Sequence, residues 1–196
     1  MKQIAFFDFD GTITTKDSLL EFIKFSKGKL HFYAGFLLYS PLLVAYKLKI
    51  ISNQTAKEKV LCFFYRGMSV ADFEKKCEAF ASEVLPDLIR PKAMQEIRKM
   101  QSLGVQVVIV SASPETWIRP WVDSIGAELL GTRLMMQDGK LTGKLDGCNC
   151  YGDEKVRRIE EKYALADYSK IYAYGDSSGD KPMLKMANIS FYRPFR

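Results

Sequence analysis

The stretch Gln3-Ile-Ala-Phe-Phe-Asp8-Phe-Asp10-Gly11-Thr12 is a short apolar run that ends in two carboxylates and a glycine. A run of this length that stops at a glycine predicts a buried β-strand followed by a loop. Asp8 and Asp10 lie two residues apart, so an extended chain turns both side chains toward one site. Carboxylates held this close repel each other, and an oxygen-binding cation such as Mg²⁺ relieves the repulsion. Gly11 leaves backbone N–H groups open to an anion, although a plain surface turn is the alternative interpretation.

Two further strands follow along the chain. Val105–Val110 is apolar and rich in β-branched residues, as buried parallel strands are, and Lys170–Tyr174 leads into Gly175-Asp176. The remaining predicted elements are helices from Pro91 to Gly104, from Pro114 to near Gly126, over 153–163 and over 180–187, a hairpin around Asp138-Gly139, and a last strand over 189–192. This alternation predicts an α/β fold with a Rossmann-like, mainly parallel sheet and helices on both faces.

Residues 15–88 interrupt the alternation directly after the first strand. Their apolar residues recur at helical spacing, and Ser69 and Asp72 have the spacing of a helix cap. We therefore expect a Rossmann-like catalytic core formed by residues 1–14 and 89–196, with residues 15–88 inserted as an all-helical cap.

Polar residues stand where the predicted strands end, which is where such sheets bind ligands. Asp176 and Asp180, in Gly175-Asp-Ser-Ser-Gly-Asp180, add two carboxylates to those that follow the first strand. One suits direct ligation of a metal, and the other suits a hydrogen bond to a metal-bound water or a neighbouring donor. The alternative is a helix cap with a favourable dipole.

The second strand end supplies groups that suit an anion. Ser111 offers a hydroxyl, the amides of Ala112 and Ser113 follow, and a helix start at Pro114 favours negative charge. Lys155 reaches a phosphate as a mobile point charge. The alternatives are that Ser113 caps the helix and that Lys155 is solvated.

These motifs, in this order along alternating strands, resemble those of haloacid dehalogenase superfamily phosphatases. DFDGT (8–12), SAS (111–113), Lys155 and GDSSGD (175–180) match the first to fourth motifs, and the resemblance covers nearly the whole chain. The inserted helices and the SASPE and YGDEK contexts resemble subfamily IB, which includes the phosphoserine phosphatases. The resemblance implies a Mg²⁺-dependent phosphomonoester hydrolase.

The resemblance also implies roles for individual residues. Asp8 is expected to be the nucleophile that forms an aspartyl-phosphate, and Asp10 the general acid and base. The metal ligands implied are Asp8, the backbone carbonyl of Asp10, and Asp176, with Asp180 orienting metal-bound waters. The phosphate-binding groups implied are Gly11, Ser111, Ala112 and Lys155.

Substrate specificity is expected to come from the cap. Phosphoserine phosphatases use a cap Glu and Arg to bind the ammonium and carboxylate of the substrate, whereas this chain has Asp17 at the comparable position after the first motif. The cap cation is expected to be Lys57 or Lys59, neither of which offers the bidentate fork of arginine. Phosphoserine is therefore a weakened candidate, and a small phosphomonoester and an anionic lipid phosphate, similar to phosphatidylglycerophosphate, both stay open.

Charge is concentrated in one part of a chain that is 47% hydrophobic, 27% charged and +6 overall. Residues 16–50 carry six lysines, Lys49 among them, against two acids, around an uncharged run over 30–46. Buried helices are one interpretation of that run, and contact with a membrane interface is the other. No recognition-helix signature accompanies the basic charge, so no nucleic-acid partner is expected. We expect a cytoplasmic protein, with peripheral contact at the inner face of a membrane as an option.

Two other functions compete with hydrolysis. A phosphotransferase or mutase would pass the phosphoryl group from Asp8 to a hydroxyl. A non-catalytic membrane-surface binding protein would need none of the motif residues, and their presence argues against it.

Overall fold

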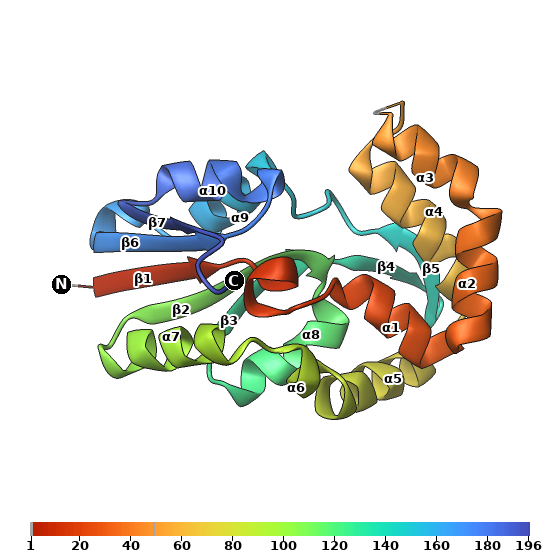
Figure 1. The fold of residues 1–196 in the computed structure, drawn as a ribbon, viewed down its shortest axis with the longest axis horizontal. Coiled ribbons are helices and arrows are strands. Elements are labelled where there is room, and N and C mark those ends of the chain that lie inside the picture. The colour runs from red at the N-terminus through yellow and green to blue at the C-terminus, as the bar shows by residue number, and fades with distance from the viewer. Residues whose placement is uncertain (1, 49) are drawn as a thin grey trace.

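A five-stranded sheet forms the centre of the molecule, which the computed structural model describes over residues 2–48 and 50–196. The strands lie in the order β3-β2-β1-β6-β7, and all run parallel (Figure 1). They are β1 (Lys2–Phe7), β2 (Gln106–Pro114), β3 (Glu128–Thr132), β6 (Tyr168–Gly175) and β7 (Ile189–Tyr192). The predicted parallel sheet is confirmed. Because β1 lies between β2 and β6, the carboxyl end of β1 is flanked by those of both neighbours.

Helices cover both faces of the sheet, as predicted (Figure 1). They are α7 (Pro91–Ser102) and α8 (Glu115–Ser124) on one face and α9 (Asp153–Lys162) and α10 (Lys181–Met186) on the other. The alternation of side chains along β1 builds the two layers. Ala5 and Phe7 pack into the apolar cluster that includes α7 and α8. Ile4 and Phe6 pack into the cluster that includes α9 and α10.

The segment between β1 and α7 folds into helices at the end of the molecule toward which the strands point (Figure 1). These are α1 (Ser18–Lys27), α2 (Lys29–Leu38), α3 (Ser40–Lys47), α4 (Asn53–Tyr65), α5 (Val70–Glu83) and α6 (Leu85–Leu88). The predicted cap at Ser69 is present, since its hydroxyl accepts from the Asp72 amide at 3.1 Å. Phe22 of α1 stacks on Trp117 of α8 with ring centroids 4.8 Å apart, so one apolar core joins the insertion to the sheet layer.

The predicted hairpin is formed by β4 (Leu134–Gln137) and β5 (Lys140–Leu145). It packs against the inserted helices: a Cβ on Gly143 would lie 2.4 Å from the Cα of Cys62 in α4. The amide of Leu141 also donates to the carbonyl of Met68 at 2.9 Å. The division of the chain into a core (1–14 and 89–196) and a cap (15–88) stays a prediction, and the hairpin, although it lies in 89–196, makes its contacts with the cap.

The uncharged run over 30–46 forms α2 and α3, and the expectation that it is buried is correct for one face only. Phe32 and Gly35 are buried, and a Cβ on Gly35 would lie 2.5 Å from the ring of Phe64. Leu30 and Leu37, on the other face of α2, are 87% and 77% exposed. A helix at the edge of the molecule has a neighbour on one side only, so an apolar sequence all round it leaves one apolar face uncovered. Lys49 lies outside the described residues; within them, no helix combines the length and the apolar character needed to cross a bilayer.

Candidate active site

Three strand ends meet at the edge of the sheet that faces the inserted helices. Asp8 follows β1, and its amide donates to the carbonyl of Tyr174 in β6 at 2.9 Å. Ser111 lies in β2, and Asp176 directly follows β6. The parallel pairing of β1 with β2 and β6 therefore brings together residues separated by more than 60 positions in the sequence.

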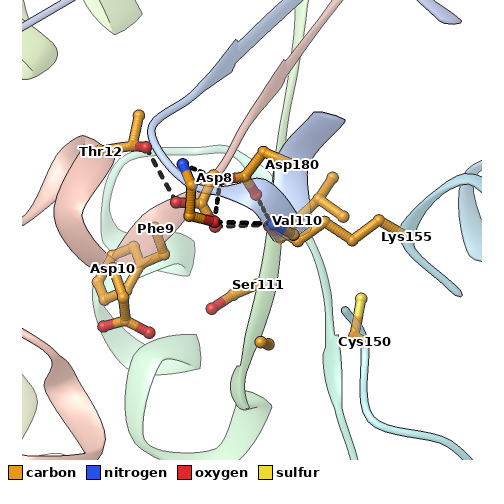
Figure 2. Close-up of polar contacts among 12 residues, drawn as sticks. Asp8, Phe9, Asp10, Thr12, Val110, Ser111, Cys150, Lys155 and Asp180 are labelled. Carbon is orange, nitrogen blue, oxygen red and sulfur yellow. Dashed lines mark hydrogen bonds and ion pairs between the residues drawn. The ribbon is translucent and has the colours of Figure 1, made fainter. Parts of the chain in front are cut away.

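Lys155 is the centre of a buried ionic cluster (Figure 2). Its ammonium donates to Asp8 Oδ1 at 2.6 Å, to Asp180 Oδ1 at 2.7 Å and to the carbonyl of Val110 at 2.7 Å. All three of its donor positions are thus occupied. Burial alone would lower the pKa of Lys155, but the charges of Asp8 and Asp180 outweigh it and hold that pKa above its ordinary value. Lys155 is consequently a fixed cation in contact with the Asp8 carboxylate.

Asp8 is buried, and burial disfavours the charged form of its carboxyl group. Burial raises the pKa of Asp8 to about 7, against the opposing charge of Lys155. Thr12 donates from its hydroxyl to Asp8 Oδ2 at 2.9 Å, so each oxygen of Asp8 accepts one hydrogen bond. An added cation close to this oxygen pair would favour the charged form.

The turn after β1 needs a glycine. Gly11 has φ of +83°, and a Cβ at this position would lie 2.7 Å from Asp176 Oδ2. Any side chain would be strained and would displace Asp176. The amide of Gly11, expected to bind phosphate, donates to Thr14 Oγ1 at 3.2 Å.

Asp8, Asp176 and Asp180 form a buried acidic group in which one oxygen from each lies within 4.8 Å of the others. Asp180 uses Oδ2 to accept from the amides of Asp176 and Ser177, at 3.1 and 2.9 Å, and from the Ser177 hydroxyl. Its two oxygens are thus engaged by the protein, which suits the predicted positioning role. Burial raises the pKa of Asp176, while Arg196, which forms an ion pair with Asp176, opposes the rise. An all-oxygen group with unfavourably buried charge fits Mg²⁺.

Asp10 is held by the inserted helices and by β2. Its Oδ1 accepts from the Ser18 amide at 2.7 Å, and its Oδ2 accepts from the Ser113 hydroxyl at 2.5 Å. The Ser18 hydroxyl donates to Ser113 Oγ at 3.0 Å, and the indole N–H of Trp117 donates to Ser18 Oγ at 3.2 Å. The donors therefore point in one direction along Trp117, Ser18 and Ser113 to Asp10. Burial, followed by the charge of Asp17, raises the pKa of Asp10 to about 6, and the bond from Ser113 opposes the rise.

The alternative interpretation, that Ser113 caps α8, is wrong. Pro114 precedes the helix without a side-chain capping bond, β2 continues to Pro114, and the Ser113 hydroxyl donates to Asp10 instead. A carboxylate is a stronger acceptor than the other partners within reach, so tertiary contact decides the direction of the hydroxyl. The amide of Ser113 donates to Ser111 Oγ at 3.0 Å, which fixes the buried Ser111 beside Asp8 and Asp10 (Figure 2).

A cavity of about 330 Å³ opens over these residues. Residues at and near the strand ends line one part of it, and the inserted helices line the other. The first set is Asp8, Asp10, Ala112, Ser113, Tyr151, Lys155, Ser177 and Asp180. The residues from the inserted helices are Asp17, Leu19, Leu20, Phe36, Tyr46, Asn53, Ala56, Lys57 and Val60. A volume of this size accommodates a small ligand.

Of the three cap residues predicted to set specificity, the structure brings two to the cavity. Asp17 lines it and also caps α1, accepting from the Leu20 amide at 3.2 Å. Lys57 lines it and donates to the carbonyl of Ala112 at 2.7 Å and to Asn149 Oδ1 at 2.8 Å. Burial lowers the pKa of Lys57 to about 8, against the charges of Asp10 and Asp17. Lys59 is exposed and does not line the cavity.

Sequence reasoning missed the residues that hold Lys57 in place. Asn149 Oδ1 accepts from Lys57 and from the Thr132 hydroxyl, and its side-chain Nδ2 donates to Asn53 Oδ1 at 2.6 Å. Asn149 lies beyond the hairpin and contacts residues 92 to 96 positions away, so no local pattern marks it. Ser18 was missed for the same reason, because only the fold brings it to Asp10 and Ser113.

Comparison of the sequence with models of known families agrees with the arrangement of the site. The model of haloacid dehalogenase-like hydrolases matches residues 5–185, which include every strand end described above. The chain belongs to the haloacid dehalogenase-like hydrolases. Protein CicA of Caulobacter vibrioides is 41% identical over 194 residues, which cover 97% of this chain and 85% of CicA.

Two further relatives of this haloacid dehalogenase-like hydrolase carry more specific descriptions. A probable phosphatase of Mycobacterium tuberculosis is 33% identical over 98% of this chain and 69% of its own length. A substrate-bound phosphoserine phosphatase structure is 17% identical, with a TM-score of 0.71 over 98% of this chain and 86% of that one. The predicted family and fold, with phosphoserine phosphatase-like structural neighbours, are thus confirmed.

Proposed function

We propose that this haloacid dehalogenase-like hydrolase cleaves phosphomonoesters, with Mg²⁺, through an aspartyl-phosphate on Asp8. The observation that carries the proposal is the arrangement of two differently held carboxylates at one strand end. Asp8 contacts the buried cation of Lys155, whereas Asp10 is held on the other side by Ser18 and Ser113. Asp8 thus lies beside a cation that suits a phosphoryl group. Asp10, whose pKa is raised to about 6, is suited to exchange a proton.

In the first half of the reaction, Asp8 attacks phosphorus and the bond from phosphorus to the ester oxygen breaks. Asp10 supplies a proton to the leaving oxygen, which a carboxyl group with a pKa of about 6 is suited to do near neutral pH. Lys155 and the Ser111 hydroxyl would hold phosphoryl oxygens as negative charge develops, together with the amides of Gly11 and Ala112.

In the second half, a water attacks the phosphorus of the aspartyl-phosphate. Asp10, now a carboxylate, accepts a proton from that water, and the bond from phosphorus to Asp8 breaks to release inorganic phosphate. Asp8 and Asp176 would ligate Mg²⁺ together with the Asp10 carbonyl, and Asp180 would position the ligands through Lys155 and Ser177. The ion's chemistry is to offset negative charge between these carboxylates and the phosphoryl oxygens.

The cavity favours a leaving group that is partly apolar. Leu19, Leu20, Phe36 and Val60 line it opposite the carboxylates, and Lys57 is the cation that the inserted helices bring to it. An ammonium binds an anion as a point charge, without the paired geometry by which a guanidinium selects a carboxylate. We therefore propose a phosphomonoester with an apolar portion, taken either from solution or from a lipid phosphate, with Asp17 and Lys57 as specificity residues.

The test is phosphate release with and without Mg²⁺, in wild type, Asp8→Asn and the matched surface variant Asp123→Asn. The substrates are p-nitrophenyl phosphate, phosphoserine, and phosphatidylglycerophosphate or lysophosphatidate in mixed micelles. We expect Mg²⁺-dependent release by wild type and Asp123→Asn, and a loss of at least about 10⁴-fold in Asp8→Asn. Turnover by Asp8→Asn near the wild-type rate, or none by wild type on any substrate, would overturn the proposal. Transfer of phosphate to an added alcohol in place of release would identify a phosphotransferase.

A further inference from the structure

The outer faces of α2 and α3 carry a group of exposed apolar side chains. We call it the α2–α3 surface, and it consists of Leu30, Tyr33, Leu37, Leu38, Val44 and Leu48. Residues 30, 33 and 37 recur at helical spacing along α2, as do 44 and 48 at the end of α3, so each set lies along one side of its helix. Large apolar side chains gathered on one exposed face mark a surface that contacts something else.

The stretch of sequence that carries this surface has charges of one sign. Between Glu21 and Glu58 it contains six lysines, of which Lys57 lies in the cavity, and no aspartate or glutamate. Lys29 begins α2 and Lys47 ends α3, and both are exposed. Neither forms an ion pair within residues 2–48 and 50–196. The apolar surface is therefore bordered by cations that suit a negatively charged partner.

We propose that the α2–α3 surface docks on an anionic lipid bilayer, with both helices lying in the interface. The leucines and Val44 would enter the boundary of the acyl chains, and Tyr33 would lie at the level of the headgroups. Lys29 and Lys47 would contact lipid phosphates. α2 has 10 residues, which at 1.5 Å per residue is about half the thickness of the hydrocarbon core, so docking in the plane is the geometry that its length allows.

A second copy of the chain fits this surface less well than a bilayer does. A two-fold contact through the α2–α3 surface would bring Lys29 and Lys47 of both copies into one interface, where like charges repel. An anionic bilayer offers these lysines opposite charge and offers the leucines an apolar medium at the same time.

The same helices form part of the wall of the active-site cavity. Phe36 of α2 and Tyr46 of α3 line the cavity, beside residues of the α2–α3 surface. Docking would thus place the cavity next to the lipid headgroups, from which a lipid phosphate would have a short path to Asp8. Only this consequence rests on the proposed function; docking itself does not.

The experiment is co-sedimentation of the full chain with two kinds of vesicle. One is phosphatidylcholine alone, and the other is phosphatidylcholine with about 30% phosphatidylglycerol, which gives the surface a negative potential. Leu37→Ser, at a side chain 77% exposed, is compared with Leu103→Ser, at a side chain 67% exposed on another part of the molecule. We expect wild type and Leu103→Ser to bind the anionic vesicles alike. Leu37→Ser, combined with Leu38→Ser, should weaken binding at least about tenfold, and Lys29→Gln with Lys47→Gln should remove the preference for anionic vesicles.

Two further measurements separate docking from folding and from catalysis. All these variants should hydrolyse p-nitrophenyl phosphate at the wild-type rate, and Asp8→Asn should bind vesicles as wild type does. Leu38→Trp should show a blue-shifted emission on anionic vesicles. Absence of vesicle binding by wild type, or equal binding by the double leucine variant, would overturn the proposal. So would a dimer in solution that Leu37→Ser dissociates while vesicles bind neither form. Vesicle binding without any phosphatase activity would leave docking standing and remove the proposed function.

Discussion

The polar residues of the active site and the apolar residues of the α2–α3 surface differ in what their side chains contact. We call the first set the strand-end cluster, and it consists of Asp8, Asp10, Ser111, Lys155, Asp176 and Asp180. In the cluster, Lys155 is fully buried and each of its three donors has an acceptor within 2.7 Å. On the surface, Leu30 and Leu37 are mostly exposed and cover nothing. The polar groups of Lys155 are thus satisfied within the chain, whereas the apolar side chains of the surface are left exposed. This difference supports the proposal that the sheet carries the chemistry and that the inserted helices carry recognition.

Asp10→Asn tests the proposed proton transfer in the strand-end cluster and should have the largest effect of the variants that follow. Asparagine keeps the hydrogen bond from the Ser113 hydroxyl at one oxygen but neither donates a proton to the leaving group nor accepts one from water. We expect hydrolysis of p-nitrophenyl phosphate to fall at least about 10²-fold. The leaving group p-nitrophenolate needs less protonation than an alkoxide, so the loss should be larger with phosphoserine. Equal losses with both substrates would contradict the assigned role of Asp10 in protonating the leaving group.

The cluster also predicts how stability depends on pH in the absence of metal. The pKa of Asp8 is raised by burial to about 7, above its unfolded value, so between about pH 4 and 7 the folded state binds more protons than the unfolded state. The contribution of Asp8 to the free energy of unfolding therefore decreases as pH rises from about 4 to 7 and is constant above that. Other carboxylates titrate too, and the comparison of wild type with Asp8→Asn isolates this one.

In EDTA, Asp8→Asn should be about as stable as wild type at pH 5 and more stable by about 1–3 kcal/mol at pH 8. Addition of Mg²⁺ at pH 8 should stabilise wild type and leave Asp8→Asn nearly unchanged. Urea unfolding at the two pH values measures both effects. A gap between the two proteins that is the same at pH 5 and pH 8 would show that Asp8 titrates normally.

The sequence was sufficient for the cluster because its members are marked locally. Asp8, Ser111 and Asp176 each follow an apolar run, and parallel pairing alone brings such positions to one edge of a sheet. No local sequence pattern marked the residues that hold the cluster in place. Asp10 and Ser113 are 103 residues apart, and the local signal at Ser113 pointed to a helix cap.

The sequence did not predict which face of residues 30–46 is buried, for a related reason. The run over 30–46 is apolar on every side of a helix, so its pattern does not say which face the fold will cover. Only the placement of α2 and α3 at the edge of the molecule decides that Phe32 is buried and Leu37 is exposed. Lys57 and Lys59 were likewise equivalent in the sequence, although they lie on different sides of α4.

The hydrogen-bond chain from Trp117 to Asp10 joins the cluster to the inserted helices, and Ser113→Ala tests that connection. The Ser113 hydroxyl lowers the pKa of Asp10, so its removal should raise that pKa and move the alkaline limb of the pH–rate profile to higher pH. We expect the maximum rate to fall about tenfold, since Ser113 holds Asp10 in place through its hydrogen bond. Ser113→Thr, which keeps the hydroxyl, should restore the wild-type profile. A lower rate with an unshifted profile would assign Ser113 a packing role only.

The smallest expected effect is on KM, and it distinguishes Lys57 from Lys59, two neighbouring lysines of α4. Lys57→Met removes the half-buried cation at nearly constant volume, whereas Lys59→Met changes an exposed side chain outside the cavity. For a substrate whose leaving group carries a negative charge, Lys57→Met should raise KM about three- to tenfold at pH 7 with little change in kcat, as loss of uniform binding does. Lys59→Met should leave both constants unchanged. Because the pKa of Lys57 is lowered by burial to about 8, wild type loses this cation as pH rises through 8. The KM of wild type should therefore approach that of Lys57→Met at pH 9, and a constant ratio between the two proteins from pH 7 to 9 would show that Lys57 acts through its shape and not through its charge.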